Sequence, residues 1–237
     1  FRHSQNWIGG TRPGNAAFVP PPPQRVEACM ADLERFLNDD NLPFSALTKA
    51  ALAHVQFETV HPFLDGNGRV GRLLIALVLH NEGVLRQPLL YLSLYFKQHR
   101  AEYYRLLDAS WREGDWEAWL DFFFEGVQTT ATGAVATAHR LLDLFSRDAE
   151  RVRNLGRATA NALRVFDVLR ARPLARINEL AARTGVAYPT AARAVEALAR
   201  VGIVREITGR SRDRIFAYDG YISILNEGGE PLEQGSP

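Results

Sequence analysis

The sequence is poor in cysteine and in long apolar runs, and each shortage excludes a class of protein. It contains one cysteine, Cys29, among 237 residues, which excludes an internal disulfide and a cysteine metal cluster. The longest strongly apolar run, residues 73–79, is too short to cross a membrane. The first ten residues are polar and aromatic, which does not fit a secretory signal. We therefore predict a cytoplasmic location and no membrane partner.

An excess of charge of one sign is also missing from the chain as a whole. Lys and Arg number 28 and Asp and Glu number 27, for a formal net charge of +1, so the total does not indicate a nucleic-acid partner. Residues 157–220 nevertheless hold 12 Arg and 6 acidic residues, a balance of +6, which leaves −5 for the remainder. The length allows two modest domains. We predict a first domain over residues 1–150, a second over residues 157–225 and a flexible tail over residues 226–237.

The residues that best indicate chemistry form the stretch HPFLDGNGRVGR, from His61 to Arg72. Residues 66–68 tolerate positive φ and leave backbone N–H groups uncovered. A helix that begins near Gly68 adds free N–H groups and the positive end of its dipole, which together predict a phosphate site. Arg69 and Arg72 are three residues apart, so they share a face of that helix and can bind phosphate oxygens.

Two other interpretations of this stretch fit less well. It is not a Walker A loop, because the Gly-Lys-Ser/Thr sequence is missing. A plain glycine turn between two core helices, with His61 as a helix cap, is the simpler alternative. A plain turn has no need of His61, Asp65 and two arginines on one face. We therefore favour a reactive site.

The stretch fits the pattern H-x-F-x-[DE]-G-N-G-R-x-x-R at all eight fixed positions, so the chain resembles the Fic family over roughly residues 1–150. The resemblance implies a protein adenylyltransferase, which transfers AMP from ATP to a Ser, Thr or Tyr hydroxyl of a target protein or of itself and releases pyrophosphate. Two other uses of the same site stay open, namely removal of AMP and transfer of another phosphate-containing group. The alternative of a different class is a nucleotide-sensing, DNA-binding regulator.

The residues of the motif make chemical sense of that activity. His61, with an ordinary pKa of about 6.5, takes the proton from the acceptor hydroxyl. Asp65 supplies an oxygen ligand for Mg²⁺. Backbone N–H groups and the Asn67 side chain hold the α-phosphate, and the two arginines hold the outer phosphates. The nucleotide-binding residues predicted in this loop and helix are Gly66, Asn67, Gly68, Arg69, Gly71 and Arg72.

Residues 6–19 contain two short apolar pieces around a Pro-Gly-Asn turn, which predicts a β-hairpin ended by the prolines at 20–23. The resemblance implies that this hairpin is a flap, which binds an extended segment of the target protein by strand addition. It also implies that Ile8, Gly9 and Gly10 line the nucleotide pocket. A loose N-terminal arm is the alternative.

Most of the remaining pattern predicts a mainly α fold. Helical spacing predicts helices over residues 24–37 and from Ser45 to about residue 59, and Pro62 ends the second near His61. We interpret His54 and Glu58 on that second helix as structural. The apolar run 73–79 predicts a buried helix. The resemblance implies that two later aromatic residues flank the adenosine, with packing in the core as the alternative: Tyr103 and Tyr104.

From about residue 157, three helices followed by two alternating strands resemble a winged helix-turn-helix domain. Its third helix presents Tyr188, Thr190 and Arg193 outward. Its wing adds three further cations, so DNA binding through phosphate contacts is one prediction. Dimerisation, including a homodimer, or docking of a partner is the other, because fold does not fix function. The wing cations are Arg210, Arg212 and Arg214.

The sequence contains one pattern that could indicate regulation. Many Fic proteins carry an inhibitory helix with the pattern [ST]-x-x-x-E-[GN], whose glutamate pairs with the second motif arginine, here Arg72. In proteins built like this one that helix usually precedes the flap. One match is present at residues 223–228, with Glu227 as the glutamate. A chance match is the alternative, so the source of an inhibitory glutamate stays open.

Overall fold

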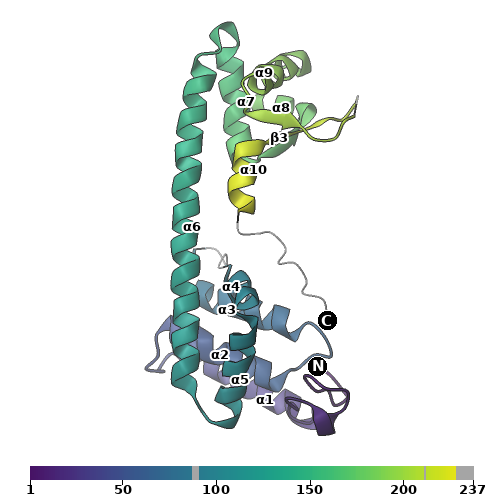
Figure 1. The fold of residues 1–237 in the computed structure, drawn as a ribbon, viewed down its shortest axis with the longest axis vertical. Helices are drawn as coiled ribbons and strands as arrows, with labels where there is room; N and C mark the ends of the chain where they lie inside the picture. Colours follow the sequence, from purple (N-terminus) through teal and green to yellow (C-terminus); the bar gives the residue numbers. More distant parts are fainter. Residues whose placement is uncertain (87–90, 211, 228–237) are drawn as a thin grey trace. The chain divides into compact units, whose positions relative to one another are not determined.

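The computed structural model describes residues 1–86, 91–210 and 212–227, and it divides into two compact units, Phe1–Thr132 and Gly133–Pro237 (Figure 1). Both units are built mainly from helices and the second holds a small sheet, which confirms the predicted fold class. The domain limits placed at residues 150 and 157 stay a prediction. The expected tail lies outside the described residues from residue 228 onward. No described helix is both long and apolar enough to span a bilayer.

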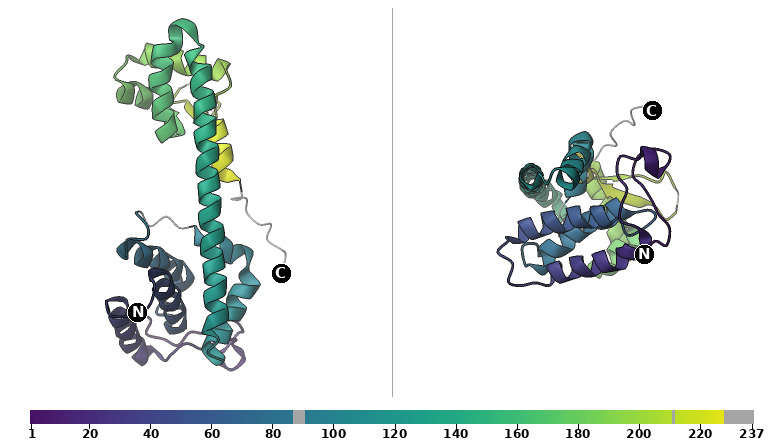
Figure 2. Two further views of the ribbon diagram at one scale, coloured as in Figure 1. Left: turned by 90° about the vertical axis from the view of Figure 1, so that its left-hand side faces the viewer. Right: turned by 90° about the horizontal axis from the view of Figure 1, so that it is seen from below.

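The first unit is a stack of helices around α2 (Figure 2). α2 packs against α1 on one side and α3 on the other. Ser45 caps α2 as predicted, because its hydroxyl accepts the Thr48 backbone N–H at 3.1 Å. The helices of this unit are α1 (Pro23–Leu37), α2 (Ala46–Val60), α3 (Asn67–Asn81), α4 (Leu92–Gln98), α5 (Arg100–Arg112) and the first part of α6 (Trp116–Arg153).

The core of this unit is aromatic. Trp119 and Phe123 are fully buried, and Phe96 lies between them and Tyr103. The Trp119 indole N–H donates to the Ala51 carbonyl at 3.1 Å, which satisfies its one polar group. The start of α6 is thereby fixed against α2, the helix that ends at the predicted reactive loop.

Residues 73–79 were expected to form a buried helix, but one face of that helix is exposed. Ile75 and Leu79 are buried, but Leu73 and Leu77 are 53% and 47% exposed. All four lie on α3, and a helix that packs against its neighbours along one side leaves the opposite side open. The apolar run continues around the helix, so the sequence alone did not show which side is covered.

The flap is shorter than the expected hairpin. Its two arms meet at one antiparallel bridge between Ile8 and Phe18, and a short 3-10 helix (Pro13–Asn15) makes the turn. Gly9 and Gly10 have φ of 70° and 68°, which ends the extended arm after Ile8. The Phe18 ring stacks on Trp111 with centroids 3.9 Å apart, so the flap is anchored to α5.

The second unit has the predicted winged-helix order. The strands form an antiparallel sheet in the order β1-β3-β2, with Ala175 opposite Phe216 and Arg205 opposite Ala217. β1 was not predicted, because three residues after Pro173 are too few to show an alternating pattern. The elements are α7 (Thr159–Ala171), β1 (Leu174–Arg176), α8 (Ile177–Thr184), α9 (Tyr188–Arg200), β2 (Val204–Glu206), β3 (Ile215–Tyr218) and α10 (Asp219–Asn226), with a 3-10 turn (Gly156–Ala158) before α7.

Candidate active site

His61 occupies the corner where α2 ends, as the sequence predicted. Its backbone is left-handed, with φ 47° and ψ 59°, and its N–H closes the last helical turn onto the Phe57 carbonyl at 2.9 Å. Pro62 disfavours a further helical residue before it. Left-handed backbone is uncommon outside glycine and costs about 1–2 kcal/mol. The surrounding structure must therefore hold this corner in place.

Asn67 closes the loop that follows. Its side chain is 2% exposed, its Oδ1 accepts the Phe63 N–H at 2.9 Å, and its Nδ2 donates to the Phe63 carbonyl at 2.7 Å. Its Oδ1 and one of its two Nδ2–H donors are used inside the loop, and the expected role of this side chain as a phosphate donor stays a prediction. Its role is to fix the shape of residues 63–67.

The backbone N–H groups of the loop are open. Gly66 has φ 84°, and its carbonyl accepts the Arg69 and Val70 N–H groups at 3.1 and 3.0 Å. In the described part of the chain, the N–H groups of residues 66–68 make no hydrogen bond outside the helix. Residues 67 and 68 also stand in the first turn of α3, where an N–H has no partner within the helix. These amides and the start of the α3 dipole are suited to bind an anion.

Both motif arginines lie against the glycines of the loop. A Cβ atom on Gly66 would be 3.4 Å from the Arg69 Nη2, and a Cβ atom on Gly68 would be 3.1 Å from the Arg72 Nη1. Arg69 also pairs with Asp65 at 3.3 Å, but the two side chains are 76% and 94% exposed. An exposed pair of this kind contributes little and is easily exchanged for a phosphate.

Arg2 holds the His61 corner from the other side, and sequence reasoning missed it. It is 3% exposed, its Nε donates to the His61 carbonyl at 2.9 Å, and its backbone N–H donates to the Pro62 carbonyl at 2.8 Å. A second donor of its guanidinium reaches the Pro21 carbonyl. No pattern marks an arginine near the start of a chain as a clamp for residues 61 and 62, so no signal was available.

Burial lowers the pKa of His61, the Arg2 charge lowers it further, and the Glu58 backbone carbonyl acts in the opposite direction. Two more titratable side chains of α2 are buried behind it. Burial lowers the pKa of His54 to about 4. Burial also raises the pKa of Glu58 to about 7, although Arg72 opposes the shift. His61 is therefore neutral at physiological pH, the form that accepts a proton.

Two further predicted site residues lie in the interior. Gly71 is buried where α3 crosses α2, and a Cβ atom there would overlap the Glu58 Oε1, so this glycine permits close helix packing. Tyr103 is 4% exposed, and its hydroxyl is 2.9 Å from the His54 Nε2. Tyr104 is 48% exposed. Of the two tyrosines, only Tyr104 has a ring open to a ligand.

One hydrogen bond joins the flap to the loop. The Asn6 side chain donates to the Phe63 carbonyl at 3.2 Å, the same carbonyl that Asn67 bonds. Gly9 and Gly10, a few residues further on, are exposed, and Ile8 is half-buried. The flap base is thus joined to the loop, while the predicted nucleotide-lining residues stay a prediction.

Asp65 is suited to one part of a magnesium site. Its carboxylate is open to solvent at the rim of the loop. Among the described residues there is no group of three or more His, Cys, Asp or Glu that could hold an ion by itself. Mg²⁺ commonly takes one or two protein carboxylates and completes its shell with water and substrate phosphates. The residues present fit an ion that arrives with a nucleotide.

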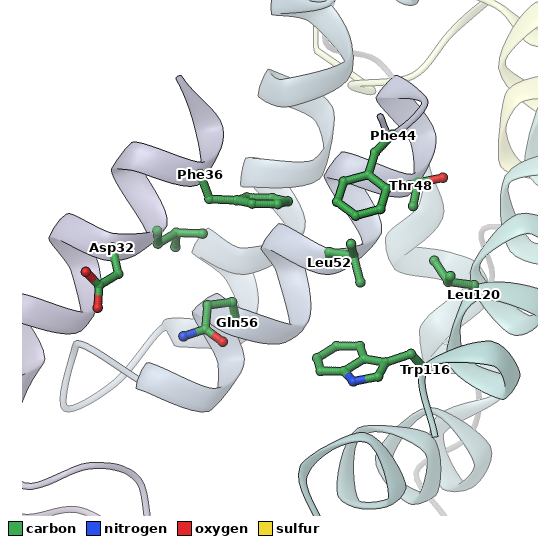
Figure 3. A pocket seen from close by; sticks show the side chains of 9 residues that line it. Asp32, Phe36, Phe44, Thr48, Leu52, Gln56, Trp116 and Leu120 are labelled. Atoms are coloured by element: carbon green, nitrogen blue, oxygen red, sulfur yellow. The ribbon is translucent and has the colours of Figure 1, made fainter. Parts of the chain in front are cut away.

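A cavity of about 540 Å³ lies away from this loop, between α1, α2 and the start of α6 (Figure 3). Phe44, Leu52 and Trp116 supply its apolar walls, and Asp32 and Gln56 stand at its edge. None of the predicted site residues lines it. The chemistry predicted from the sequence therefore belongs to the open loop and not to this cavity.

Comparison with known proteins agrees with this geometry. Residues 1–79 match the model of the Fic/DOC family, a range that includes the flap, α1, α2, the loop and most of α3. Over these residues the chain is similar to the Fic/DOC family. Residues 158–207 match the model of the IclR helix-turn-helix domain, which agrees with the winged helix of the second unit.

Relatives of the Fic/DOC domain include proteins named "Protein adenylyltransferase Fic". That of Drosophila erecta is 33% identical and that of Aedes aegypti 34% identical, each over 131 residues, or 55% of this chain. The chain spans about a quarter of their length, 24% and 23%. A solved Fic family protein from Desulfovibrio desulfuricans G20 matches with TM-score 0.47 and 24% identity, covering 84% of this chain and 57% of that chain.

The helix-turn-helix unit presents several of the residues predicted to contact DNA. Tyr188 is 55% exposed at the start of α9, and Arg193 is exposed one turn later. Arg214 lies over the Phe216 ring at 5.4 Å. At the other end of this unit, Glu227 pairs with Arg140 at 2.7 Å. The glutamate of the inhibitory pattern is thus bound within its own unit.

Proposed function

We propose that this chain is a protein adenylyltransferase, which transfers AMP from ATP to a Ser, Thr or Tyr hydroxyl of a protein and releases pyrophosphate. One observation carries the proposal. A loop closed by Asn67 joins a corner that holds a neutral histidine to the open amides of residues 66–68. A base and an anion site on one short loop are what transfer of a phosphorus group to a hydroxyl requires.

The roles of the residues follow from this arrangement. His61 takes the proton of the acceptor hydroxyl, and the oxygen then attacks the α-phosphorus. The amides of residues 66–68 hold the α-phosphate oxygens, where negative charge increases during the reaction. Arg69 and Arg72 fold over the loop and bind the outer phosphates, which orients pyrophosphate as the leaving group.

Asp65 would hold Mg²⁺ together with the nucleotide. When bound, the ion supplies positive charge to the phosphate oxygens. Tyr104, whose ring is open, is our choice for contact with the adenine, and Tyr103 supports it from the core through their edge-on contact, with centroids 5.2 Å apart. The flap would bind an extended segment of the target protein at its free arm.

The test is incubation of the purified chain and a cell extract with α-labelled ATP and Mg²⁺. We expect label on protein with wild-type chain and none with His61→Ala. A matched control is His80→Ala, since His80 is exposed and lies at the last turn of α3, on the helix that follows the loop. Equal labelling by wild type and His61→Ala would contradict the proposal. Removal of label from an already modified protein would support the alternative activity.

A second function is supported by the IclR helix-turn-helix match, and it concerns the other unit. We propose that the winged helix binds DNA, with α9 in the major groove and the wing arginines on phosphates. This predicts a specific, salt-sensitive complex. A winged helix that serves dimerisation instead would give a dimer in solution and no preference for any DNA sequence.

A further inference from the structure

Glu58 is a buried acidic side chain one helical turn before His61, and the proposed reaction leaves it without a role. It is 5% exposed, on the inner face of α2. Its Oε1 is buried and has no hydrogen-bond partner in the described part of the chain. Its Oε2 lies 4.0 Å from the His61 Nδ1. A buried ionised carboxylate without a full set of hydrogen-bond partners destabilises the fold, so its presence suggests a functional role.

The His61 Nδ1, which faces Glu58, also lacks a hydrogen-bond partner in the described part of the chain. This nitrogen is buried and without a geometric hydrogen-bond partner among the described residues, although the Glu58 backbone carbonyl raises the pKa of the ring. The Nε2 of the ring is not among the buried atoms of the described residues that lack a partner. Nδ1 is the ring nitrogen that faces the Glu58 carboxylate. Hydrogen bonds of catalytic groups are often long before substrate binds and shorten in the complex. The distance of 4.0 Å between the His61 Nδ1 and the Glu58 Oε2 is of this kind.

We propose that Glu58 is a positioning residue for His61, an inference that rests on the proposed adenylyl transfer. Its carboxylate accepts the His61 Nδ1–H, which leaves the Nε2 lone pair free for the acceptor hydroxyl. When Nε2 takes the proton, the ring becomes a cation, and the carboxylate stabilises that cation. Glu58 does not touch substrate and acts only through the histidine.

The groups around this pair come from each packed element. His54 lies on α2 itself, Arg72 approaches from α3, and the Tyr103 hydroxyl from α5. Arg2 of the N-terminal segment faces His61. The two arginines favour the ionised carboxylate and the neutral imidazole, which are the forms that the role requires.

The pH dependence of activity follows from the order in which the pair titrates. The pKa of Glu58 is raised to about 7 by burial, and the pKa of His61 is lowered by burial. His61 is therefore already neutral when Glu58 ionises on the way up in pH. Activity should rise through about pH 7 with an apparent pKa that belongs to the pair. Without the carboxylate, this rise should move to lower pH, where His61 alone titrates.

The test compares wild type, Glu58→Gln, Glu58→Asp and the control Glu82→Gln. Glu82 is paired with Lys49 at 2.8 Å at the far end of α3 from the loop. For Glu58→Gln we expect kcat of labelling to fall about 10- to 100-fold, with KM for ATP unchanged and the acid limb displaced downward. Glu58→Asp should recover part of kcat, and Glu82→Gln should match wild type.

A second measurement needs no activity. Nitrogen-15 NMR of the His61 ring in the wild-type chain should show Nδ1 protonated and Nε2 bare above pH 7, with an inflection near pH 7 from Glu58. The same ring in Glu58→Gln should lose that inflection. If labelling is absent but the ring behaves in this way, the adenylyl transfer fails and the Glu58–His61 pairing stands.

Three results would overturn the inference by itself. One is an active Glu58→Gln whose kcat and pH limb equal those of wild type. Another is a His61 ring whose titration and tautomer are the same in both proteins. The last is a loss of activity through KM alone, since a residue that acts through the base must change kcat. Unfolding of Glu58→Gln would leave the wild-type titration and Glu58→Asp to decide the question.

Discussion

At the scale of single residues, burial decides what the polar groups around the loop can do. Asn67 and Glu58 are both buried, yet Asn67 has two partners and Glu58 has an oxygen with none among the described residues. The Asn67 side chain therefore stabilises the loop, whereas the ionised form of Glu58 destabilises the folded chain. Two predictions follow from this contrast, one for each residue.

Asn67→Ala should destabilise the chain and abolish labelling. It removes both bonds to Phe63, which leaves the Phe63 N–H unpaired and the Phe63 carbonyl with the Asn6 side chain alone, at a cost of about 1–3 kcal/mol. Urea denaturation checks the free energy of unfolding. Asn38→Ala is the control, because Asn38 makes one bond to the Glu34 carbonyl at 2.8 Å on an exposed surface. A loss for Asn67→Ala no larger than for Asn38→Ala would contradict the loop-closing role.

Glu58→Gln should be more stable than wild type at alkaline pH. The pKa of Glu58 is raised from 4.5 to about 7 in the fold. Stability that is fully present below pH 4.5 is therefore lost progressively between pH 4.5 and about 7, and glutamine avoids that loss. We expect a gain of about 3 kcal/mol at pH 8.5 and no more than about 1 kcal/mol at pH 5. Thermal unfolding at both values checks it, and a less stable variant at pH 8.5 would contradict it.

At the same scale, the sequence predicted the position of the site better than its details. His61, Asp65 and the glycines could be placed because their spacing is local and turn chemistry is local. Arg2 could not, because its contact with His61 spans 59 residues. Glu58 left a weak signal, an acid on the inner face of a helix three residues before a histidine. The sequence could not show that Gly71 faces Glu58 and that Asn67 bonds Phe63.

At the scale of elements, the flap and α9 are the two surfaces that we propose bind partners. The flap has one bridge and one aromatic anchor. A two-stranded ribbon of this size is marginally stable without such an anchor. Its predicted hairpin was shortened by the positive φ of Gly9 and Gly10, a feature that their small size allows but does not dictate.

Phe18→Ala should loosen the flap without unfolding the unit. It removes the stacking on Trp111, worth about 0.5–1.5 kcal/mol. Hydrogen exchange of the Ile8 and Phe18 amides, which bond across the bridge, should become faster, while that of α2 amides stays unchanged. Val19→Ala, at a position that is 43% exposed, is the control. Unchanged exchange in Phe18→Ala would mean that the bridge does not depend on the ring.

Arg193→Ala should weaken DNA binding and reduce the salt dependence of the affinity, because Arg193 is an exposed cation on α9, the helix that we propose enters the major groove between the phosphate backbones. The slope of log K against log salt should fall by about 1 for each phosphate that the variant no longer neutralises. Arg170→Ala is the control, because Arg170 lies on α7 and already pairs with Asp167 at 3.3 Å. Fluorescence anisotropy over a salt series measures both. Equal slopes for all three proteins would contradict the α9 interface.

At the scale of the whole molecule, no hydrophobic cluster of the described residues joins the two units. Two clusters belong to the first unit, a large one that reaches Val127 of α6 and a small one between α1 and α2 around Leu33, Ala53 and Phe57. The cluster of the second unit begins at Leu144 of α6 and continues through α7 to α10. Residues 131–136 of α6 are exposed. Chain length and the change of pattern near residue 157 predicted two domains, whereas the contacts within the structure group into units that meet inside α6, between Thr132 and Gly133.

Fragments 1–132 and 133–237 should therefore each fold. Each keeps its own core, and the cut at residue 132 falls in the exposed part of α6. We expect the full chain to unfold in two calorimetric transitions, each reproduced by one fragment. The first fragment should retain labelling activity and the second DNA binding. A single transition for the full chain, with both fragments unfolded, would contradict independent units.

The central claim is that the loop from His61 to Arg72 directs attack on the α-phosphorus of ATP. The most direct test gives the purified chain ATP labelled at either the α- or the γ-phosphorus and measures the label on protein. The account predicts label from the α-position alone, and its loss in His61→Ala. Label from the γ-position, or α-label that persists in His61→Ala, would contradict it.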